Sequence, residues 1–471
     1  MKTRKNGQAQ EIIFVSAMDL LSGNNNNNNI DNNNNDQPER AEQEEELVAP
    51  SAFAPSYRWQ KGAGVPAISH LRFPFELKPD QAQAVEAWIG NSCRGSVIYS
   101  SGTGKTEIAF ECARRVAEMR GNRGRLNIVM LVPRIVLVGQ NCARLARYGI
   151  PSDAIGRYYG EQKDIQEITI CTYQSAIGKP DIVRQADMVI LDEVHLANPL
   201  SRTYGRIYDV ISRETKKALL GLTATIDEDD PKAMLILSIM PPARKYPIRD
   251  AVGDGRLAKP VVFPLEVNLT EKEQKNYDEH SRKIRAISGR FKRYNAKGMM
   301  ELARQGGFPS WQARAWFLNV RRRKALLACA ENKLARAAEV IMKEHPGEKV
   351  MVFSETLESV RKLRHLLAGH GVPAMIIDGS MQSYRRQKIL SEWGRKFYPL
   401  LSVHTLEIGF DVPEVGIEII LATTSNMNQI VQRVGRVLRK AEGKESALIY
   451  AIYVSDTKDR FTLESIKRAV S

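Results

Sequence analysis

The chain has 471 residues, of which 43% are hydrophobic and 26% charged, a balance typical of globular proteins with two or three domains. It contains no run of 18 apolar residues, which excludes a membrane-spanning helix, and its five cysteines form no CxxC pair, which argues against a disulfide scaffold or a zinc site. The formal net charge of +15 favours a polyanionic partner.

Residues 1–50 are predicted to be a disordered low-complexity tail. They contain two asparagine runs and an acidic cluster, and they hold four Lys and Arg against nine Asp and Glu, so the basic excess lies in the rest of the chain. Such sequence buries too little apolar surface to offset the entropy of the chain. An apolar stretch near the start is interrupted by Asp19 and lacks a cleavage site, so we expect no secretion. The tail could contact protein partners.

Residues 51–255 are predicted to form an α/β domain. Five apolar runs of strand length end here at Ser100, Val132, Thr172, Asp192 and Thr223. They are rich in Val, Ile and Leu and do not alternate with polar residues, which is typical of strands buried on both faces of a parallel sheet. Helical patterns separate the runs and indicate repeated βαβ units.

A second series of apolar runs follows Gly347 and predicts another α/β domain over 341–471. Between the two domains, residues 256–340 are predicted to be a linker and a helical segment, because from about residue 265 the pattern is helical and shows no strand signal.

The first apolar run leads into YSSGTGKT, Tyr99 to Thr106, which has the spacing of a phosphate-binding loop. Gly102, Thr103 and Gly104 form a tight turn whose N–H groups can converge on phosphate oxygens. Lys105 would reach the β- and γ-phosphates, and Thr106 would supply a magnesium ligand. A glycine-rich turn with an unrelated lysine is the alternative. The strand before the loop and the helix after it favour the phosphate site.

A second acidic motif, VILDEVH, ends a hydrophobic strand. Asp192 would be a second magnesium ligand, and Glu193 would act as general base toward the attacking water. Alone, the pair could be a solvated turn at a strand end. Together with Lys105 it predicts a nucleoside triphosphatase.

With DEVH at residues 192–195, the chain resembles a superfamily 2 helicase of the DEAD/DEAH type, and the resemblance covers roughly residues 75–455. It implies two RecA-like parallel-sheet P-loop domains in tandem with a helical basic insertion between them, and ATP and Mg²⁺ as cofactors. In the first domain it implies that Gln81 reads adenine, that Arg134 lines a nucleic-acid track with Thr172 and Gln174, and that Thr223 and Thr225 couple hydrolysis to movement.

In the second half, VFSET resembles motif IV and TLEIGFDVPEV resembles motif V. The resemblance implies a nucleic-acid contact at Thr405 and nucleotide contacts at Gly409 and Asp411. QRVGRVLR, residues 432–439, resembles motif VI.

Motif VI also has a physical basis, because Gln432, Arg436 and Arg439 are spaced i, i+4 and i+7 and would share one helix face. Guanidinium groups carry a permanent charge and suit phosphoryl oxygens. We predict that these arginines complete a site built by the first domain. An amphipathic helix with a solvated basic face is the alternative, and the motif alone would favour it.

Residues 282–324 hold thirteen Lys and Arg against a single acid, with six aromatics interleaved. Cations can neutralise phosphates and aromatic faces can stack on bases, so we predict contacts with nucleic acid through Arg290, Arg293 and Trp311. Relatives of the resembled family carry a thumb-like helical insertion at this place. Trp316 and Phe317 could instead be core residues.

The stretch GRYYGEQKDIQEITICTYQS resembles the branch of xeroderma pigmentosum B-type and phage recombination helicases. The resemblance implies an ATP-dependent nucleic-acid motor, a DNA helicase or branch-migrating translocase, with DNA favoured over RNA. An RNA helicase, a motor subunit of a restriction or remodelling complex, and a binding scaffold remain alternatives. We expect a cytoplasmic or nucleoid location, nuclear in a eukaryote.

Overall fold

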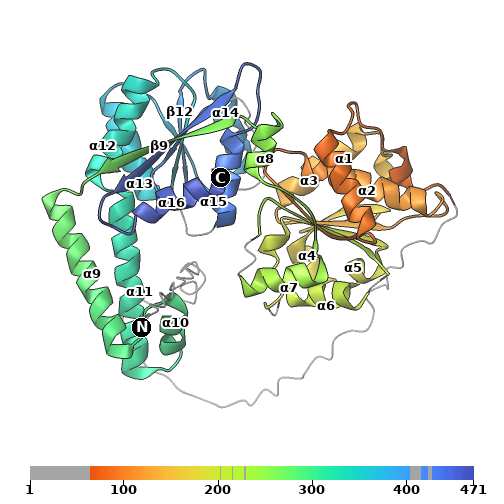
Figure 1. Ribbon diagram of the computed structural model, residues 1–471, viewed down its shortest axis with the longest axis horizontal. Coiled ribbons are helices and arrows are strands. Elements are labelled where there is room, and N and C mark those ends of the chain that lie inside the picture. The colour runs from red at the N-terminus through yellow and green to blue at the C-terminus, as the bar shows by residue number, and fades with distance from the viewer. Residues whose placement is uncertain are drawn as a thin grey trace, which may run out of the picture.

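The computed structural model describes residues 64–201, 203–214, 216–226, 230–403, 415–422 and 427–470. Two lobes, each built on a sheet, lie side by side, and a helical hairpin projects from the second lobe (Figure 1). The tail at 1–50 and the motif V residues Thr405, Gly409 and Asp411 lie outside the described residues. Within the described residues, every helix is too short or too polar to cross a bilayer.

The sheet of the first lobe has eight strands in the order β4-β3-β5-β2-β6-β7-β1-β8. All pairings are parallel except that of β3 with β4. The predicted apolar runs are strands β1, β2, β5, β6 and β7, and side chains are buried along nearly their whole length. The strands are β1 (Arg94–Tyr99), β2 (Ile128–Val132), β3 (Ile155–Tyr159), β4 (Gln162–Lys163), β5 (Ile168–Thr172), β6 (Met188–Asp192), β7 (Ala218–Thr223) and β8 (Pro242–Tyr246).

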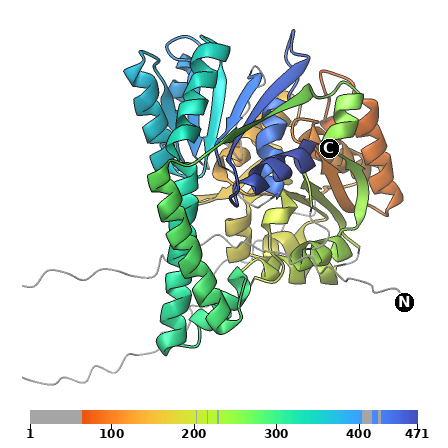
Figure 2. The same cartoon turned by 60° about the vertical axis from the view of Figure 1, so that its left-hand side comes forward.

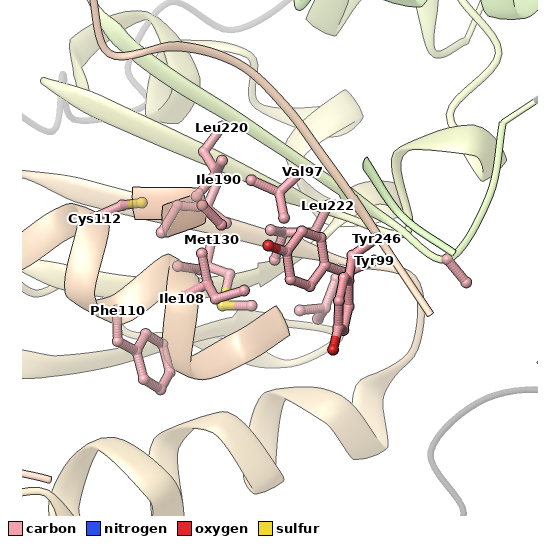
Figure 3. Close-up of a cluster of buried hydrophobic side chains, with 14 of the residues drawn as sticks. Val97, Tyr99, Ile108, Phe110, Cys112, Met130, Ile190, Leu220, Leu222 and Tyr246 are labelled. Atoms are coloured by element: carbon pink, nitrogen blue, oxygen red, sulfur yellow. The ribbon is translucent and has the colours of Figure 1, made fainter. Parts of the chain in front are cut away.

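Helices cover this sheet and anchor the phosphate loop. Figure 3 shows side chains of the strands, including Val97, Met130 and Ile190, packed with Ile108 of α2. The helices are η2 (Ala67–His70), α1 (Pro79–Gly90), α2 (Lys105–Met119), α3 (Ile135–Arg147), η3 (Ser152–Ala154), α4 (Tyr173–Gly178), α5 (Asp181–Gln185), η4 (Val194–Leu196), α6 (Gly205–Arg213), α7 (Pro231–Ile239) and α8 (Ile248–Gly253). The loop between β1 and α2 is therefore held between two parts of one core.

The second lobe has six parallel strands in the order β11-β12-β10-β13-β14-β9. They are β9 (Lys259–Val267), β10 (Val350–Ser354), β11 (Met375–Ile377), β12 (Pro399–Val403), β13 (Ile417–Ile420) and β14 (Ser446–Val454). The helices of this lobe are α12 (Glu331–Glu339), η5 (Val340–Glu344), α13 (Leu357–Gly369), α14 (Ser383–Glu392), α15 (Met427–Val437) and α16 (Arg460–Val470). Two parallel α/β lobes confirm the predicted fold class.

One part of the predicted organisation needs correction. Residues 259–267 lie in the interval assigned to a linker and helices, yet they form β9, which pairs with β14 along its whole length. Pro260 and Pro264 obscure the strand pattern, and β9 tolerates them because it is an edge strand. Helix α12, from the same interval, packs Leu334 and Ala337 into the core of the second lobe. Only residues 271–328 therefore project from this lobe.

The projecting segment, hereafter the thumb, consists of α9 (Glu271–Phe291), α10 (Ala296–Ala303) and α11 (Gly307–Ala328), and Figures 1 and 2 show it extending away from the second sheet. It has a small core of its own, to which Ile284, Met299 and Trp316 belong. Trp316 is 6% exposed, and its Nε1 donates a hydrogen bond to Ser288 Oγ (2.9 Å). Trp316, and the half-buried Phe317, are therefore core residues of the thumb.

Candidate active site between the two lobes

The phosphate loop has the backbone that its glycines allow. Gly102 and Gly104 adopt φ angles of 86° and 88°, in the left-handed region that favours glycine. A Cβ atom on Gly104 would lie 2.1 Å from Gln81 Nε2, so the position has no space for a side chain. The loop ends at the N-terminus of α2, where unpaired N–H groups and the helix dipole favour an anion.

Lys105 lies at the centre of the charged groups. Its Nζ donates to the carbonyl oxygen of Tyr99 (2.9 Å). Burial lowers the pKa of Lys105, Glu193 and Asp192 raise it, and Arg439 from the second lobe lowers it again. Acids of the first lobe and an arginine of the second lobe therefore both act electrostatically on this amine. Nearby, Thr103 Oγ1 donates to the Ser100 carbonyl oxygen (2.7 Å), and Thr106 is half-buried.

Gln81 is tied to the phosphate loop by its amide. Its Nε2 donates to the carbonyl oxygens of Thr103 (3.1 Å) and Gly104 (3.4 Å), and its Oε1 accepts from Lys78 N (2.9 Å). The side chain is almost fully buried. In this structure Gln81 therefore holds the loop in place, and its reading of adenine stays a prediction.

The acidic pair lies at the carboxyl end of β6. Burial and the neighbouring Glu193 raise the pKa of Asp192, while Lys105 opposes them. The Tyr173 hydroxyl donates to the Asp192 carbonyl oxygen (2.9 Å). Glu193 has a φ of 50°, a strained value for a residue with a side chain. Its Oε2 is buried and accepts no hydrogen bond from the described part of the chain.

His195 links this acid to Thr223 at the end of β7. His195 Nδ1 lies 2.9 Å from Thr223 Oγ1 and 3.4 Å from Glu193 Oε2. Burial lowers the pKa of His195, which keeps the imidazole neutral near pH 7. Thr223 in turn donates to the carbonyl oxygen of Thr225 (2.7 Å). These contacts link Glu193 to the end of β7, and the coupling role of Thr223 and Thr225 stays a prediction. Among the described residues, no group of three or more His, Cys, Asp and Glu side chains is placed to hold a metal ion.

Helix α15, which carries motif VI, is pressed against the phosphate loop. A Cβ atom on Gly435 would lie 2.9 Å from Ser101 Cβ, and one on Gly102 would lie 2.8 Å from Arg439 Cγ. Gln432 and Arg436 are 5% and 6% exposed, and Arg439 is half-buried. The alternative of a solvated basic face is therefore wrong. The second lobe places Arg439 directly against the loop that would hold phosphate.

The residues predicted to contact nucleic acid fall into two groups. Arg134 and Gln174 are exposed beyond the carboxyl ends of β2 and β5, and Thr172 accepts from Ser175 N as the N-cap of α4 (3.3 Å). Arg290, Arg293 and Trp311 are exposed on the thumb, which lies apart from the contact of the two lobes (Figure 2). The first group therefore lies at the ends of two neighbouring strands of the first sheet, and the second group lies on the thumb, away from that sheet.

Two residues near the site were missed from the sequence. Arg256 contacts the phosphate loop from the chain that leads to β9, and nothing in its sequence context distinguishes it from a linker arginine. Glu418 is fully buried on β13 between apolar neighbours, and a charge inside IEII was a signal that could have found it. Burial raises the pKa of Glu418 to about 8, and Arg433 and Arg436 oppose that shift.

Two family models match the chain in the order of the lobes. The model described as "Type III restriction enzyme, res subunit" matches residues 74–228, and the "Helicase conserved C-terminal domain" matches residues 332–441. A relative named DNA 3′-5′ translocase XPB2, from Sulfurisphaera tokodaii, is 26% identical over 402 residues, which cover 83% of this chain and 86% of the relative. The two family matches identify the chain as a superfamily 2 helicase, and it is similar to the XPB-type branch of that superfamily.

Other similarities support this assignment of the helicase. The DNA 3′-5′ helicase XPB of Mycobacterium tuberculosis is 24% identical over 399 residues, which cover 82% of this chain but only 62% of that protein. Among solved structures, the Pyrococcus furiosus Hef helicase domain aligns with a TM-score of 0.52 at 19% identity, over 82% of this chain and 98% of that one. The DNA-bound Type ISP restriction-modification enzyme LlaBIII aligns with a TM-score of 0.58 at 17% identity, over 84% of this chain and 30% of that one. The two structures support the fold, and the family matches establish an ATP-driven motor.

Proposed function

We propose that this helicase hydrolyses ATP between its two lobes and uses the energy to move along DNA in the 3′ to 5′ direction. The contact of the motif VI segment with the phosphate loop is the observation that carries the proposal, because it places Arg439 of one lobe against Gly102 of the other. The substrate and the direction are taken from the names of the XPB-type relatives.

Each residue of the site would have a separate role in phosphoryl transfer. Lys105 and the N-terminus of α2 would hold the β- and γ-phosphates, and Glu193 would orient and deprotonate the attacking water. Arg436 and Arg439 would stabilise the charge that develops in the transition state. Because the arginines and the lysine belong to different lobes, hydrolysis would favour separation of the lobes, and this cycle can drive movement.

The site also fits a magnesium ion. Thr106 and Asp192 offer the hydroxyl and carboxylate oxygens that Mg²⁺ prefers. Burial and the neighbouring Glu193 raise the pKa of Asp192, and Glu193 Oε2 accepts no hydrogen bond from the described residues, which supports further charge compensation at this point. A bound Mg²⁺ would supply that compensation and neutralise phosphate charge.

The thumb would grip the nucleic acid. Phe308 and Trp311 are 54% and 64% exposed and lie near each other, with ring centroids 6.4 Å apart. The Arg290 guanidinium lies over the Phe308 ring at 5.8 Å. Exposed aromatic rings among arginines suit stacking on bases next to phosphates. This surface would hold the strand while the lobes open and close.

The test is ATP hydrolysis measured with single-stranded, duplex, forked and four-way DNA, and with matched RNA strands. We expect DNA to stimulate hydrolysis several-fold and RNA to stimulate it less. Equal rates with and without nucleic acid would overturn the proposal. Stronger stimulation by RNA would instead identify an RNA helicase. Measuring displacement of a labelled strand from 3′- and 5′-tailed duplexes tests the direction.

A motor subunit of a restriction complex is the second candidate, because the model that matches residues 74–228 describes the res subunit of a restriction enzyme. In that case a partner would cut the DNA, since the described residues contain no cluster suited to a nuclease metal. A binding scaffold would need a disabled motor, and Lys105, Glu193 and Arg439 are all present. Purification with native partners, followed by an assay for ATP-dependent cleavage, separates these candidates.

We further propose that the protein works in the cytoplasm or nucleoid. We also propose that protein partners bind through the asparagine-rich tail at residues 1–50. Removal of the tail would leave ATP hydrolysis unchanged and abolish partner capture. A loss of basal hydrolysis would contradict this role for the tail.

A further inference from the structure

The chain segment that joins the lobes contacts the phosphate loop through one side chain. Arg256, just after α8, donates from Nη2 to the carbonyl oxygen of Thr103 (2.7 Å). Its Nε lies 3.3 Å from Asp80 Oδ1, and the two side chains are 20% and 7% exposed. Arg256 thus forms a largely buried, charged contact with the first lobe.

The next three residues contact the second lobe. Leu257 forms an antiparallel bridge with Arg439, Ala258 N donates to the Leu438 carbonyl oxygen (2.7 Å), and Lys259 N donates to the Glu445 carbonyl oxygen (2.8 Å). Figure 1 shows α8 between the two lobes, where this segment begins. Four consecutive residues therefore connect the phosphate loop to the segment after α15 that carries Arg439.

The contact with Thr103 has a consequence for phosphate binding. In a trans peptide the C=O and the following N–H point in opposite directions. The Thr103 carbonyl is held on one side by Gln81 Nε2 and by Arg256 Nη2, so the N–H of Gly104 is directed to the other side. Phosphate-binding loops use such N–H groups as anion donors. Arg256 therefore constrains the orientation of a phosphate donor.

We propose that Arg256 is a positioning residue that couples closure of the lobes to ATP binding. When the lobes are closed, Arg256 orients the Gly104 N–H toward the phosphate position. The residues that follow Arg256 hold Arg439 against the same loop from the second lobe. When the lobes separate, Arg256 leaves with the connecting segment and the loop loses this constraint. Asp80 holds the guanidinium in place. The inference rests on ATP hydrolysis at this site and explains how the two halves of the site are assembled together.

The test compares Arg256→Ala, Arg256→Lys and Asp80→Asn with the wild-type protein. Arg256→Ala should raise KM for ATP about tenfold and lower kcat, because both the phosphate donor and the arginine are displaced. Arg256→Lys should restore part of the affinity, since an amine can reach one acceptor but not both. Asp80→Asn should have a smaller effect, and the double variant should resemble Arg256→Ala, because the two residues act together.

Arg249→Ala is the matched control. Arg249 is an exposed arginine on the neighbouring helix α8, and its ion pair is with the adjacent Asp250. It should behave as wild type. Melting temperatures identify a purely structural role, which would lower stability of the Arg256 and Asp80 variants without changing ATP affinity.

Two outcomes would overturn the inference. One is an unchanged KM and kcat in Arg256→Ala, and the other is a loss confined to thermal stability. These outcomes can be distinguished from a failure of the proposed function. In that case the wild-type protein itself would show no ATP hydrolysis that depends on Lys105.

Discussion

The contact between the lobes and the tip of the thumb use similar residues in opposite surroundings. At the lobe contact Arg436 is 6% exposed and Gln432 is 5% exposed, whereas on the thumb Trp311 is 64% exposed and Arg290 and Arg293 are solvent-facing. Buried charges interact strongly and depend on a fixed geometry, while exposed ones are screened by water and salt. Substitutions between the lobes should therefore cause large losses of chemistry, and substitutions on the thumb should cause graded losses of affinity.

The largest effect is expected for Lys105→Ala. Lys105 directly follows the phosphate loop and is predicted to contact the phosphates, so its removal should abolish turnover. DNA affinity should change little because the predicted contacts with DNA lie elsewhere. Hydrolysis and DNA binding measured on the same preparation check this. Turnover that survives the substitution would place the phosphate site in another loop.

Arg439→Ala should lower kcat by about 10³-fold or more. This is the range expected when one domain supplies an arginine that stabilises phosphoryl transfer at a site on another domain. Lys440→Ala is the control, since Lys440 is adjacent in sequence and exposed. If both variants lose equal activity, the effect reflects damage to this part of the lobe, and the assignment of Arg439 as the catalytic arginine fails.

Much of the active site could be predicted because its signals are local. The glycines, Lys105 and the acids of DEVH each lie within a few residues of one strand end. Arg256 could not be predicted, because it contacts Thr103, 153 residues away in the chain. Strand β9 was missed because prolines are tolerated at a sheet edge. The alternative of a core role for Trp316 could be decided only by the packing of the thumb helices, which buries Trp316 and leaves Trp311 exposed.

Glu418 tests the cost of burying charge inside the second lobe. Its pKa is raised to about 8, so between about pH 4.5 and 8 the folded protein keeps a proton that the unfolded chain has lost. The free energy of unfolding should therefore fall as pH rises, by about 1.4 kcal/mol per pH unit at most. Glu418→Gln should remove this part of the slope and leave that of Asp192, whose pKa is also raised. Denaturant titrations of the wild-type protein and Glu418→Gln at several pH values in this range measure the two slopes. Equal slopes in the two proteins would contradict the raised pKa of Glu418.

On the thumb, Trp311→Ala should weaken binding to single-stranded DNA by about 1–3 kcal/mol through loss of one stacking surface, with basal hydrolysis retained. Leu318→Ala, which removes another exposed apolar side chain of α11, is the control and should bind as wild type. Fluorescence anisotropy with a labelled strand measures both. An equal loss in the two variants would show that α11 itself is disturbed.

The smallest effect is expected for Arg290→Ala. An exposed arginine that neutralises one phosphate should contribute through release of counterions, so affinity should fall slightly on every DNA sequence and the slope of log K against log salt should decrease by about 1. Arg290 also lies over Phe308, so Arg290→Lys distinguishes charge from the position of the ring. If lysine restores the salt slope but not the affinity, the arginine acts on the thumb partly by orienting Phe308. If neither substitution changes the slope, this side of the thumb does not face the phosphates, and the grip must be assigned to the opposite side of the helical hairpin.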